Sequence, residues 1–247
     1  MEKQLFIQPS IFPEGVVSAQ SMRLGGVSQF PYSTLNLGLY TDDDANDILE
    51  NRKRFFEALG GTFHQVCGAY QVHGTKVAVF EQAEELNGFD AFITNKKGLF
   101  LAATIADCTP ILIYDKEKEA IAAIHAGWKG TIGNIVGICL DKMNEQYGTK
   151  PIHCLAYIGA CISEHDFEVD ADVADHFAEA YKRWDEEKGK YFVDLKETNK
   201  ALLMKKGLIA EHIEVSPYST VTDNHLFFSH RKEQGRTGRA LAVISML

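Results

Sequence analysis

Two apolar runs joined by a charged turn constrain the fold more than any other feature of this sequence. The runs are Pro110–Tyr114 and Ala120–Ile124, and the charged segment 115–119 separates them. Short apolar runs bounded by polar turn residues are typical of paired antiparallel strands. The sequence therefore predicts a β-hairpin here.

Residues with metal-binding or catalytic side chains flank this hairpin at its open end. If the turn is centred near Glu117, Cys108 lies opposite His125 or Ala126, and side chains facing each other across paired strands are close neighbours. A thiol and an imidazole at strand ends can share a metal ion or act as nucleophile and base. The alternative is that both are ordinary core side chains.

A third candidate ligand, His73, precedes Gly74 just before a predicted strand. Together, His73, Cys108 and His125 match the imidazole and thiolate ligands that zinc prefers. Three protein ligands leave one coordination position open for water or substrate. Their spacing in the sequence does not decide between a metal site, a catalytic site and structural use of the same residues.

The order of predicted elements indicates the α+β class, with a mixed β-sheet core flanked by helices. We find no repeat, low-complexity tract or linker, so we expect a single domain over residues 1–247. Met22–Tyr40 is predicted to form ordered loops with short strands. Helices are predicted from Asp42–Asp44 to Leu59, from Thr131 to Tyr147, and over Asp170–Tyr181 and Leu195–Lys206; further strands are predicted at Val77–Phe80, Ala91–Thr94, Phe100–Ala106, Cys154–Ile158, Ile213–Val215 and Ala240–Ile244.

The first predicted helix has a charged residue on its apolar face. Arg52 falls at the centre of the face formed by Ile48, Leu49, Phe55, Phe56 and Leu59. Burying an unpaired charge is costly, so Arg52 is expected to pair with a carboxylate or to bind an anion such as phosphate. A purely structural ion pair, or a side chain that extends past the apolar face to solvent, is the alternative.

Two further segments carry candidate anion contacts. Gly127 and Gly130 flank Trp128 and Lys129 just before a predicted helix, so backbone N–H groups there could bind an anion, and Lys129 is a candidate substrate contact. The alternative is a turn that only lets strand and helix pack. Near the carboxyl end lie three arginines that the sequence alone does not distinguish from solvated charges: Arg231, Arg236 and Arg239.

Charge and cysteine content restrict the class of partner and the compartment. The formal net charge is −9 without a long basic run, which disfavours nucleic acid or an acidic membrane as the main partner. No long uncharged apolar stretch predicts a membrane span. The five cysteines are odd in number and form no Cys-x-x-Cys pair, which indicates reduced thiols. We therefore expect a cytoplasmic protein.

A series of motifs along nearly the whole chain resembles the YfiH family, also called the laccase-domain or multicopper polyphenol oxidase-like family. The resemblance is specific because many motifs occur in the same order. The motifs are Arg23–Ser28, Ser33–Gly38, Asn51-Arg52, Gln71–Gly74, Ala106–Pro110, His125–Thr131, Ile158–Ile162, Phe228–Arg231 and Thr237–Arg239.

This resemblance implies a zinc-dependent purine nucleoside phosphorylase that also deaminates adenosine and phosphorolyses methylthioadenosine. It implies that His73, Cys108 and His125 bind the metal and that nucleoside and phosphate contacts fall on Asn36 and Arg52. It also implies a single α+β domain similar to the cysteine deamidase toxins. The chain departs from the family pattern at Ala160 and Ser219, where proline and cysteine are usual, and neither change affects the three ligands.

The oxidase label of this family predicts features that the sequence lacks. Multicopper oxidases build copper clusters from His-x-His pairs, and no two of the nine histidines are separated by one residue. One cysteine and two histidines would bind copper only adventitiously.

Other functions remain open at this stage. A metal-free Cys108–His125 pair would make a thiol amidase or deamidase acting on amide or peptidoglycan-precursor substrates. A non-catalytic purine nucleotide sensor would use the same pocket. Purine nucleosides and phosphate are the expected partners, and the sequence leaves open whether the chain forms a homodimer.

Overall fold

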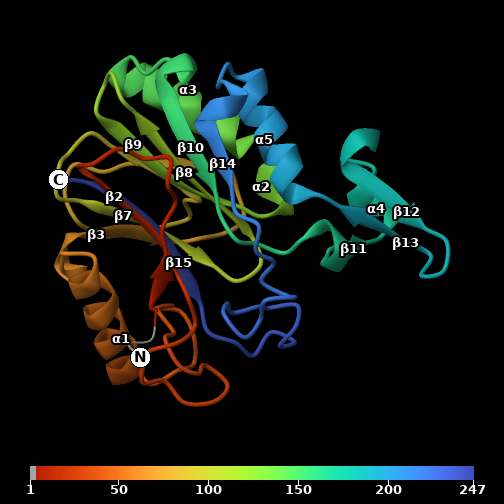
Figure 1. The fold of residues 1–247 in the computed structure, drawn as a ribbon, viewed down its shortest axis with the longest axis horizontal. Helices are drawn as coiled ribbons and strands as arrows, with labels where there is room; N and C mark the ends of the chain where they lie inside the picture. The colour runs from red at the N-terminus through yellow and green to blue at the C-terminus, as the bar shows by residue number, and fades with distance from the viewer. Residues whose placement is uncertain (1–3) are drawn as a thin grey trace.

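The chain folds into four layers in which two β-sheets lie face to face between helices (Figure 1). A computed structural model describes residues 4–247. The first sheet has the order β1 (Phe6–Ile7), β2 (Val16–Ser21), β15 (Ala240–Met246), β7 (Phe100–Ile105), β3 (Val66–Tyr70), β5 (Glu85–Asn87). The second has the order β14 (Ile213–Val215), β10 (Cys154–Ile158), β8 (Thr109–Asp115), β9 (Ala120–Ala126), β6 (Ala91–Thr94), β4 (Val77–Val79). Both sheets are mixed, because each contains parallel and antiparallel pairs.

Alternation along the central hairpin connects the layers. In β8, Ile111 and Ile113 face the helices, whereas Leu112 and Tyr114 face the other sheet. Successive side chains of a strand point to opposite faces, so a strand covered on both sides reads as a continuous apolar run. This is why the hairpin is recognisable from the sequence, and why its even-numbered positions in β8 belong to the layer between the sheets.

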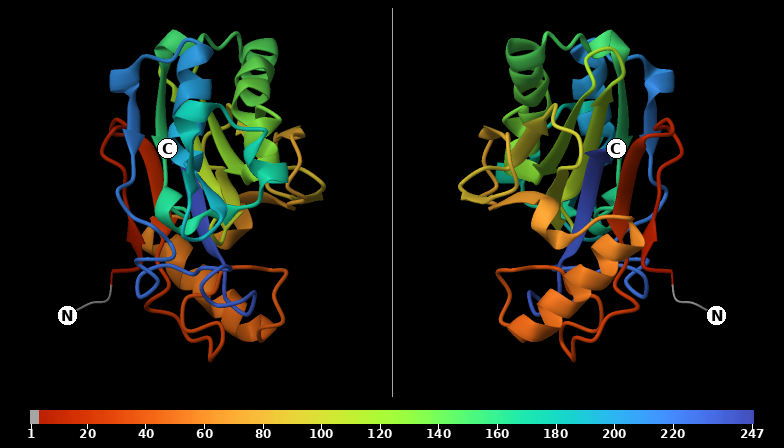
Figure 2. Two further views of the ribbon diagram at one scale, coloured as in Figure 1. Left: turned by 90° about the vertical axis from the view of Figure 1, so that its right-hand side faces the viewer. Right: turned by 90° about the vertical axis from the view of Figure 1, so that its left-hand side faces the viewer.

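Helices cover the two outer faces of this sheet pair (Figure 2). Helix α1 (Ala45–Ala58) packs on the first sheet, and its N-cap Asp44 accepts a hydrogen bond from the Asn46 amide at 2.7 Å. Helices α3 (Ile135–Tyr147) and α5 (Leu195–Lys205) pack on the second sheet. Shorter helical segments are α2 (Trp128–Ile132), α4 (Ala171–Ala174), and 3-10 turns at Phe63–Gln65, Pro151–His153, Glu164–Asp166, Glu179–Tyr181 and Ala210–His212.

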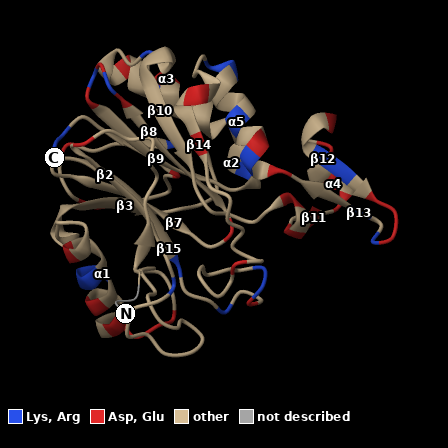
Figure 3. Cartoon of the chain, in the orientation of Figure 1, with Lys and Arg blue, Asp and Glu red and all other residues tan. Residues whose placement is uncertain are grey.

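A small three-stranded sheet extends from one side of the molecule (Figure 1). It has the order β11 (Glu168–Val169), β13 (Lys190–Val193), β12 (Lys182–Asp185). Both acidic and basic residues lie along its outer hairpin and along α1 (Figure 3). No helix within residues 4–247 has the combined length and apolar character needed to cross a membrane.

The structure confirms the α+β class and most predicted elements. The hairpin, α1, α5, β6, β10 and β14 lie where the sequence placed them, and Arg52 is buried with a 6% exposed fraction. Leu49, predicted on the buried face, is instead 47% exposed.

Four predictions of secondary structure or register were wrong. The hairpin pairs Thr109 with Ala126 and Pro110 with His125, so its register differs from the predicted one. The helix predicted from Thr131 begins at Trp128 and breaks at Asn134, whose backbone is left-handed with φ 57°. Only α4 and the 3-10 turn Glu179–Tyr181 form within the helix predicted over 170–181, because pairing of β12 with β13 and burial of Phe177 outweigh local helical propensity. The segment 22–40 contains no strand, and seven strands were not predicted: β1, β2, β3, β5, β11, β12 and β13.

Candidate metal centre

Three side chains from separate segments meet at one end of the layer between the sheets. His73 lies in the loop between β3 and β4, Cys108 in the turn between β7 and β8, and His125 near the end of β9. One nitrogen from each histidine and the Cys108 sulfur all lie within 4.8 Å of one another. The two imidazole rings are 4.8 Å apart at their centroids and nearly perpendicular. This geometry brings together the three ligands proposed from the sequence.

Strand alternation explains why two of these side chains share one face. His125 has the same parity along β9 as Ile121 and Ala123, which belong to the layer between the sheets. Its cross-strand partner is Pro110, and Cys108 lies two residues before Pro110 on the same side. The pair therefore meets diagonally at the end of the hairpin, despite the change in register.

Gly127 leaves room for the cluster. A Cβ atom at this position would lie 3.0 Å from Cδ2 of His73 and 3.1 Å from Sγ of Cys108. Both distances are tighter than ordinary contacts between such atoms, so any side chain here would push the two candidate ligands away. Glycine at the end of β9 thus allows the three side chains to converge.

Asp90, which the sequence analysis did not single out, connects the two histidines. Its side chain is fully buried and accepts hydrogen bonds from the backbone amides of His73 at 2.9 Å and Gly74 at 2.8 Å. Its Oδ1 lies 2.9 Å from Nδ1 of His125. An ionised carboxylate only accepts, so Nδ1 carries the proton and Nε2 remains as the ligand atom. Its place directly before the buried strand β6 was the available sequence signal.

Asp107 braces a loop. It directly precedes Cys108 in the chain. Its carboxylate accepts from the Thr220 hydroxyl and from the Arg231 amide, each at 2.6 Å. Its backbone has φ 83°, a conformation that L-residues rarely adopt and that recurs at functional sites. Asp107 thereby fastens the C-terminal loop over the cluster.

The charges of the cluster favour a thiolate in the metal-free protein. Burial alone would raise the pKa of Cys108, but the charge of His125 and hydrogen bonds from His125 and His73 lower it to about 6. Burial alone would lower the pKa of His125, whereas the Cys108 thiolate and Asp90 raise it to about 9. Between these values the metal-free pair is a thiolate beside an imidazolium.

Alkylation of metal-free protein is expected to show this directly. The iodoacetamide reaction at Cys108 should accelerate as pH rises through about 6 and then level off, because the thiolate is the reactive form. Burial raises the pKa of Cys161 to about 11 and that of Cys67 to about 12, so these thiols should react slowly over the same range. Mass spectrometry of modified peptides identifies the site. A fast phase that persists in Cys108→Ser would contradict this expectation.

The cluster opens into a cavity of about 440 Å³. This volume is within the range of small-molecule sites. One part of its wall is aromatic or apolar, and another part carries positive charge from the C-terminal loop. The wall includes Tyr70, Trp128, Phe167, His230, Arg231 and Arg239.

The three residues predicted to contact substrate do not line this cavity. Asn36 is fully buried and donates to the side chains of Thr41 and Asp43. Arg52 donates through Nη1 to the Leu37 carbonyl at 2.8 Å. Lys129 is exposed, with its ammonium 5.5 Å from the centroid of the Trp128 ring.

Glu85 is the carboxylate whose charge acts on Arg52. Burial lowers the pKa of Arg52, and the Glu85 charge opposes that change. The carboxylate of Glu85 accepts from the Tyr40 hydroxyl at 3.2 Å. Among the ion pairs within residues 4–247 none involves Arg52, so the expected ion pair with a carboxylate does not form, and Glu85 acts on the guanidinium only as a neighbouring charge.

Comparison with known proteins identifies the family. The family model described as multi-copper polyphenol oxidoreductase laccase matches residues 17–247. The chain belongs to this family. Purine nucleoside phosphorylase YlmD of Bacillus subtilis strain 168 is 34% identical over 246 residues, covering 94% of this chain and 88% of that protein. Purine nucleoside phosphorylase YfiH of Escherichia coli K12 is 32% identical over 240 residues, covering 95% and 96%.

A solved structure extends the similarity to the fold. The crystal structure of hypothetical protein YfiH from Bacillus licheniformis superposes with a TM-score of 0.90 at 30% identity, covering 94% of this chain and 93% of that chain. The resemblance inferred from the sequence motifs is confirmed. Within residues 4–247 the structure contains one cluster of three metal-type ligands.

Proposed function

We propose that this chain is a zinc-dependent purine nucleoside phosphorylase that also deaminates adenosine and phosphorolyses methylthioadenosine. The observation that carries the proposal is the His73, Cys108 and His125 cluster opening into a cavity of about 440 Å³. The names of the relatives from Bacillus subtilis and Escherichia coli support the phosphorylase activity.

The residues present fit zinc. Two imidazoles and a thiolate are typical zinc donors, and three protein ligands are typical of catalytic zinc sites. The low pKa of Cys108 supplies the thiolate at neutral pH. The space beside Gly127 accommodates the converging side chains. A zinc ion bound here would supply a Lewis acid that polarises a substrate atom or lowers the pKa of water.

The cavity wall provides surfaces suited to a nucleoside. Tyr70, Trp128 and Phe167 offer aromatic faces for a purine and exclude water from the bound base. Phosphorolysis requires a phosphate oxygen held against C1′ of the ribose while the purine departs. Deamination requires a water molecule at C6 of adenine in the same cavity. Both reactions need a bound purine, which is the feature that the aromatic wall supplies.

A cytoplasmic location is part of this proposal. All five cysteines are free in the structure. Unpaired thiols persist in reducing compartments. A catalytic centre that requires the Cys108 thiolate is suited to such a compartment.

A second candidate function rests on the ionisation of Cys108. The Asp90, His125 and Cys108 side chains are arranged as an orienting acid, a base and a nucleophile. With its pKa at about 6, the thiol of the metal-free protein is an activated nucleophile. This arrangement is suited to a metal-free thiol amidase or deamidase.

Metal removal separates these two functions. Protein purified without an affinity tag is expected to contain about one zinc per chain, since three ligands form one site. Chelation should remove most of the inosine cleavage in the presence of phosphate, and added zinc should restore it. Elemental analysis measures the zinc content, and product chromatography measures inosine cleavage. Full nucleoside turnover by metal-free protein would show that the zinc mechanism is wrong. If the purified protein also contains copper, restoration of turnover by zinc alone would show that copper is not required.

Product identity distinguishes the activities. Ribose 1-phosphate from inosine indicates phosphorolysis, inosine from adenosine indicates deamination, and free ribose would contradict both. Binding of nucleosides without any product would favour a purine nucleotide sensor.

A further inference from the structure

The cationic part of the cavity wall comes from the loop before β15. Arg231 and Arg239 line the same cavity as the candidate metal ligands. The guanidinium of Arg231 is exposed and donates to the carbonyls of Asp166 at 3.4 Å and Glu168 at 3.3 Å. Its Nη1 also lies 3.7 Å from Oε1 of Glu168. Arg231 therefore attaches this loop to the β11 segment through both terminal nitrogens, whereas Arg239 uses only one of its terminal nitrogens in contacts with the protein.

Arg239 lines the cavity and uses one of its guanidinium nitrogens in contacts with the protein. Its Nη1 donates to the carbonyls of Thr237 at 2.7 Å and Gly238 at 3.0 Å. Among the contacts within residues 4–247, Nε and Nη2 have no protein acceptor. Burial lowers the pKa of Arg239, and the charges of Asp107 and Cys108 oppose this shift. The side chain remains a cation at any physiological pH.

The two buried residues expected to contact substrate instead fix the position of Arg239. Oδ1 of Asn36 accepts from the Arg239 amide at 2.8 Å and from the Gly38 amide at 3.1 Å. The Leu37 amide donates to the Arg239 carbonyl at 2.9 Å. Arg52 holds the Leu37 carbonyl at 2.8 Å from the other side. A Cβ on Gly38 would lie 2.7 Å from both Cβ and Cγ of Arg239. Glycine at position 38 therefore leaves room for the Arg239 side chain.

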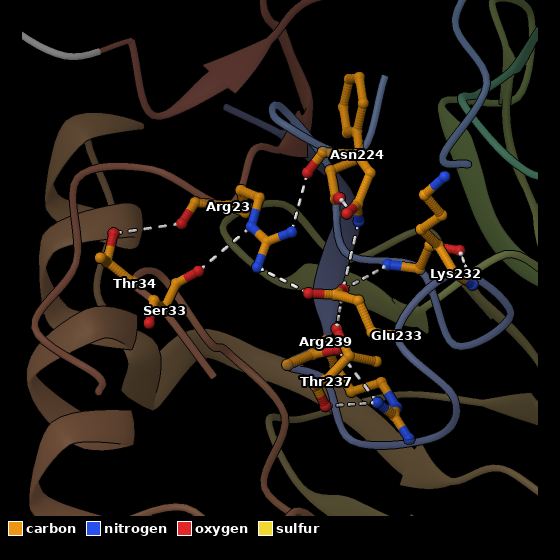
Figure 4. A network of polar contacts seen from close by, with 11 residues as sticks. Arg23, Ser33, Thr34, Asn224, Lys232, Glu233, Thr237 and Arg239 are labelled. Carbon is orange, nitrogen blue, oxygen red and sulfur yellow. Dashed lines mark hydrogen bonds and ion pairs between the residues drawn. The ribbon is translucent and has the colours of Figure 1, made fainter. Parts of the chain in front are cut away.

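The rest of the loop is held by the half-buried carboxylate of Glu233, as Figure 4 shows. Glu233 pairs with Arg23 at 2.9 Å. It also accepts from the Ser229 amide at 3.1 Å and from the Thr237 hydroxyl. Because Thr237 in turn accepts from Arg239, this network fixes the guanidinium before any ligand binds. Pre-organised donors bind an anion at lower entropic cost than mobile ones do.

We propose that Arg239 is the phosphate-binding residue of this site and that Asn36 and Arg52 are positioning residues that act through it. The inference rests on the proposed phosphorylase function. A guanidinium binds phosphate oxygens through two parallel N–H donors. The held phosphate forms the new O–C1′ bond, the C1′–N bond breaks with its electron pair going to the purine, and the proton that hydrogen phosphate gives up balances the one the purine gains.

Direct binding of inorganic phosphate tests Arg239 without relying on turnover. Arg239→Gln is expected to weaken phosphate binding to the zinc-loaded protein, measured by calorimetry, at least about tenfold, because charge-assisted hydrogen bonds are lost. The KM for phosphate in inosine cleavage should rise by the same factor with the KM for inosine and the zinc content retained. Arg236→Gln, an exposed arginine of the same loop that does not line the cavity, is the matched control.

The outcomes separate this inference from the proposed function. Unchanged phosphate affinity in Arg239→Gln overturns the inference, and so does a wild-type protein that binds no phosphate. Wild-type protein that binds phosphate but makes no ribose 1-phosphate overturns the proposed phosphorylase activity and leaves the phosphate site standing.

A double-mutant cycle tests the positioning role. Arg52→Met is expected to raise the KM for phosphate in the wild-type background and to have no further effect in the Arg239→Gln background, because coupled residues are non-additive. Additive effects would show that Arg52 acts independently of Arg239. If Arg52→Met does not fold, Gly38→Ala replaces it, since the added Cβ displaces Arg239 directly.

Discussion

Cys108→Ala is expected to lower phosphate-dependent inosine cleavage by more than about 100-fold and to remove bound zinc, while the protein stays folded. Loss of a group that only supports a metal ligand already costs 10- to 100-fold, so loss of a ligand should cost more. Cys108 lies in a turn before β8 and is partly exposed, so its truncation creates no cavity in the core. Elemental analysis, thermal unfolding and product chromatography measure the three properties.

Cys161→Ala is the matched control for this change. Cys161 is fully buried nearby, and burial raises the pKa of its thiol to about 11. Its removal should lower stability slightly and leave zinc and turnover in place. If Cys108→Ala keeps both its zinc and its activity, the assignment of the centre is wrong.

Asp90→Asn is expected to weaken zinc binding by about 10- to 100-fold and to destabilise the fold by about 2–4 kcal/mol. The amide group would present N–H donors where the carboxylate accepts from His73, Gly74 and Nδ1 of His125. Burial alone raises the pKa of Asp90, but the hydrogen bonds from His125 and Gly74 lower it overall. Its stabilising effect is therefore present above the unfolded pKa and is lost as pH falls through the lower folded value. Competition with a chromogenic chelator measures zinc affinity, and urea unfolding at several pH values measures stability.

Asp115→Asn distinguishes a general loss of stability from a specific loss of metal affinity. Asp115 is also fully buried and accepts from the backbone amides of Glu117 at 2.9 Å and Lys118 at 3.2 Å, at the opposite end of the same hairpin. This variant should lose stability and keep its zinc affinity. Equal zinc loss in both variants would contradict a specific role for Asp90.

The predictable parts of the molecule were those specified by local pattern. Apolar runs and turn residues identified the hairpin, and the N-cap Asp44 identified the start of α1. The register was missed because the Asp115 side chain organises a turn over residues 116–119, whose centre lies beyond Glu117. The periodicity of hydrophobic residues in the sequence gives no sign of that shift in register.

Residues whose roles depend on distant backbone groups were not predictable. Asp90 reads as an ordinary acid until the loop at residues 72–74 places three amides around it. Arg239 cannot be told from solvated Arg236 until Asn36 is seen to hold its backbone. In both cases the deciding contact spans a long stretch of sequence, and a single chain gives no periodic signal for it.

The convergence of His73, Cys108 and His125 from three separate segments has a consequence for biosynthesis. Cys108 acquires its lowered pKa only from neighbours that are distant in sequence. A newly made or partly folded chain therefore carries a thiol of ordinary pKa, which is less ionised at neutral pH than the thiol of the folded protein. The pKa of Cys108 falls only when the tertiary structure brings the three segments together, so the thiolate forms at neutral pH in correctly folded molecules.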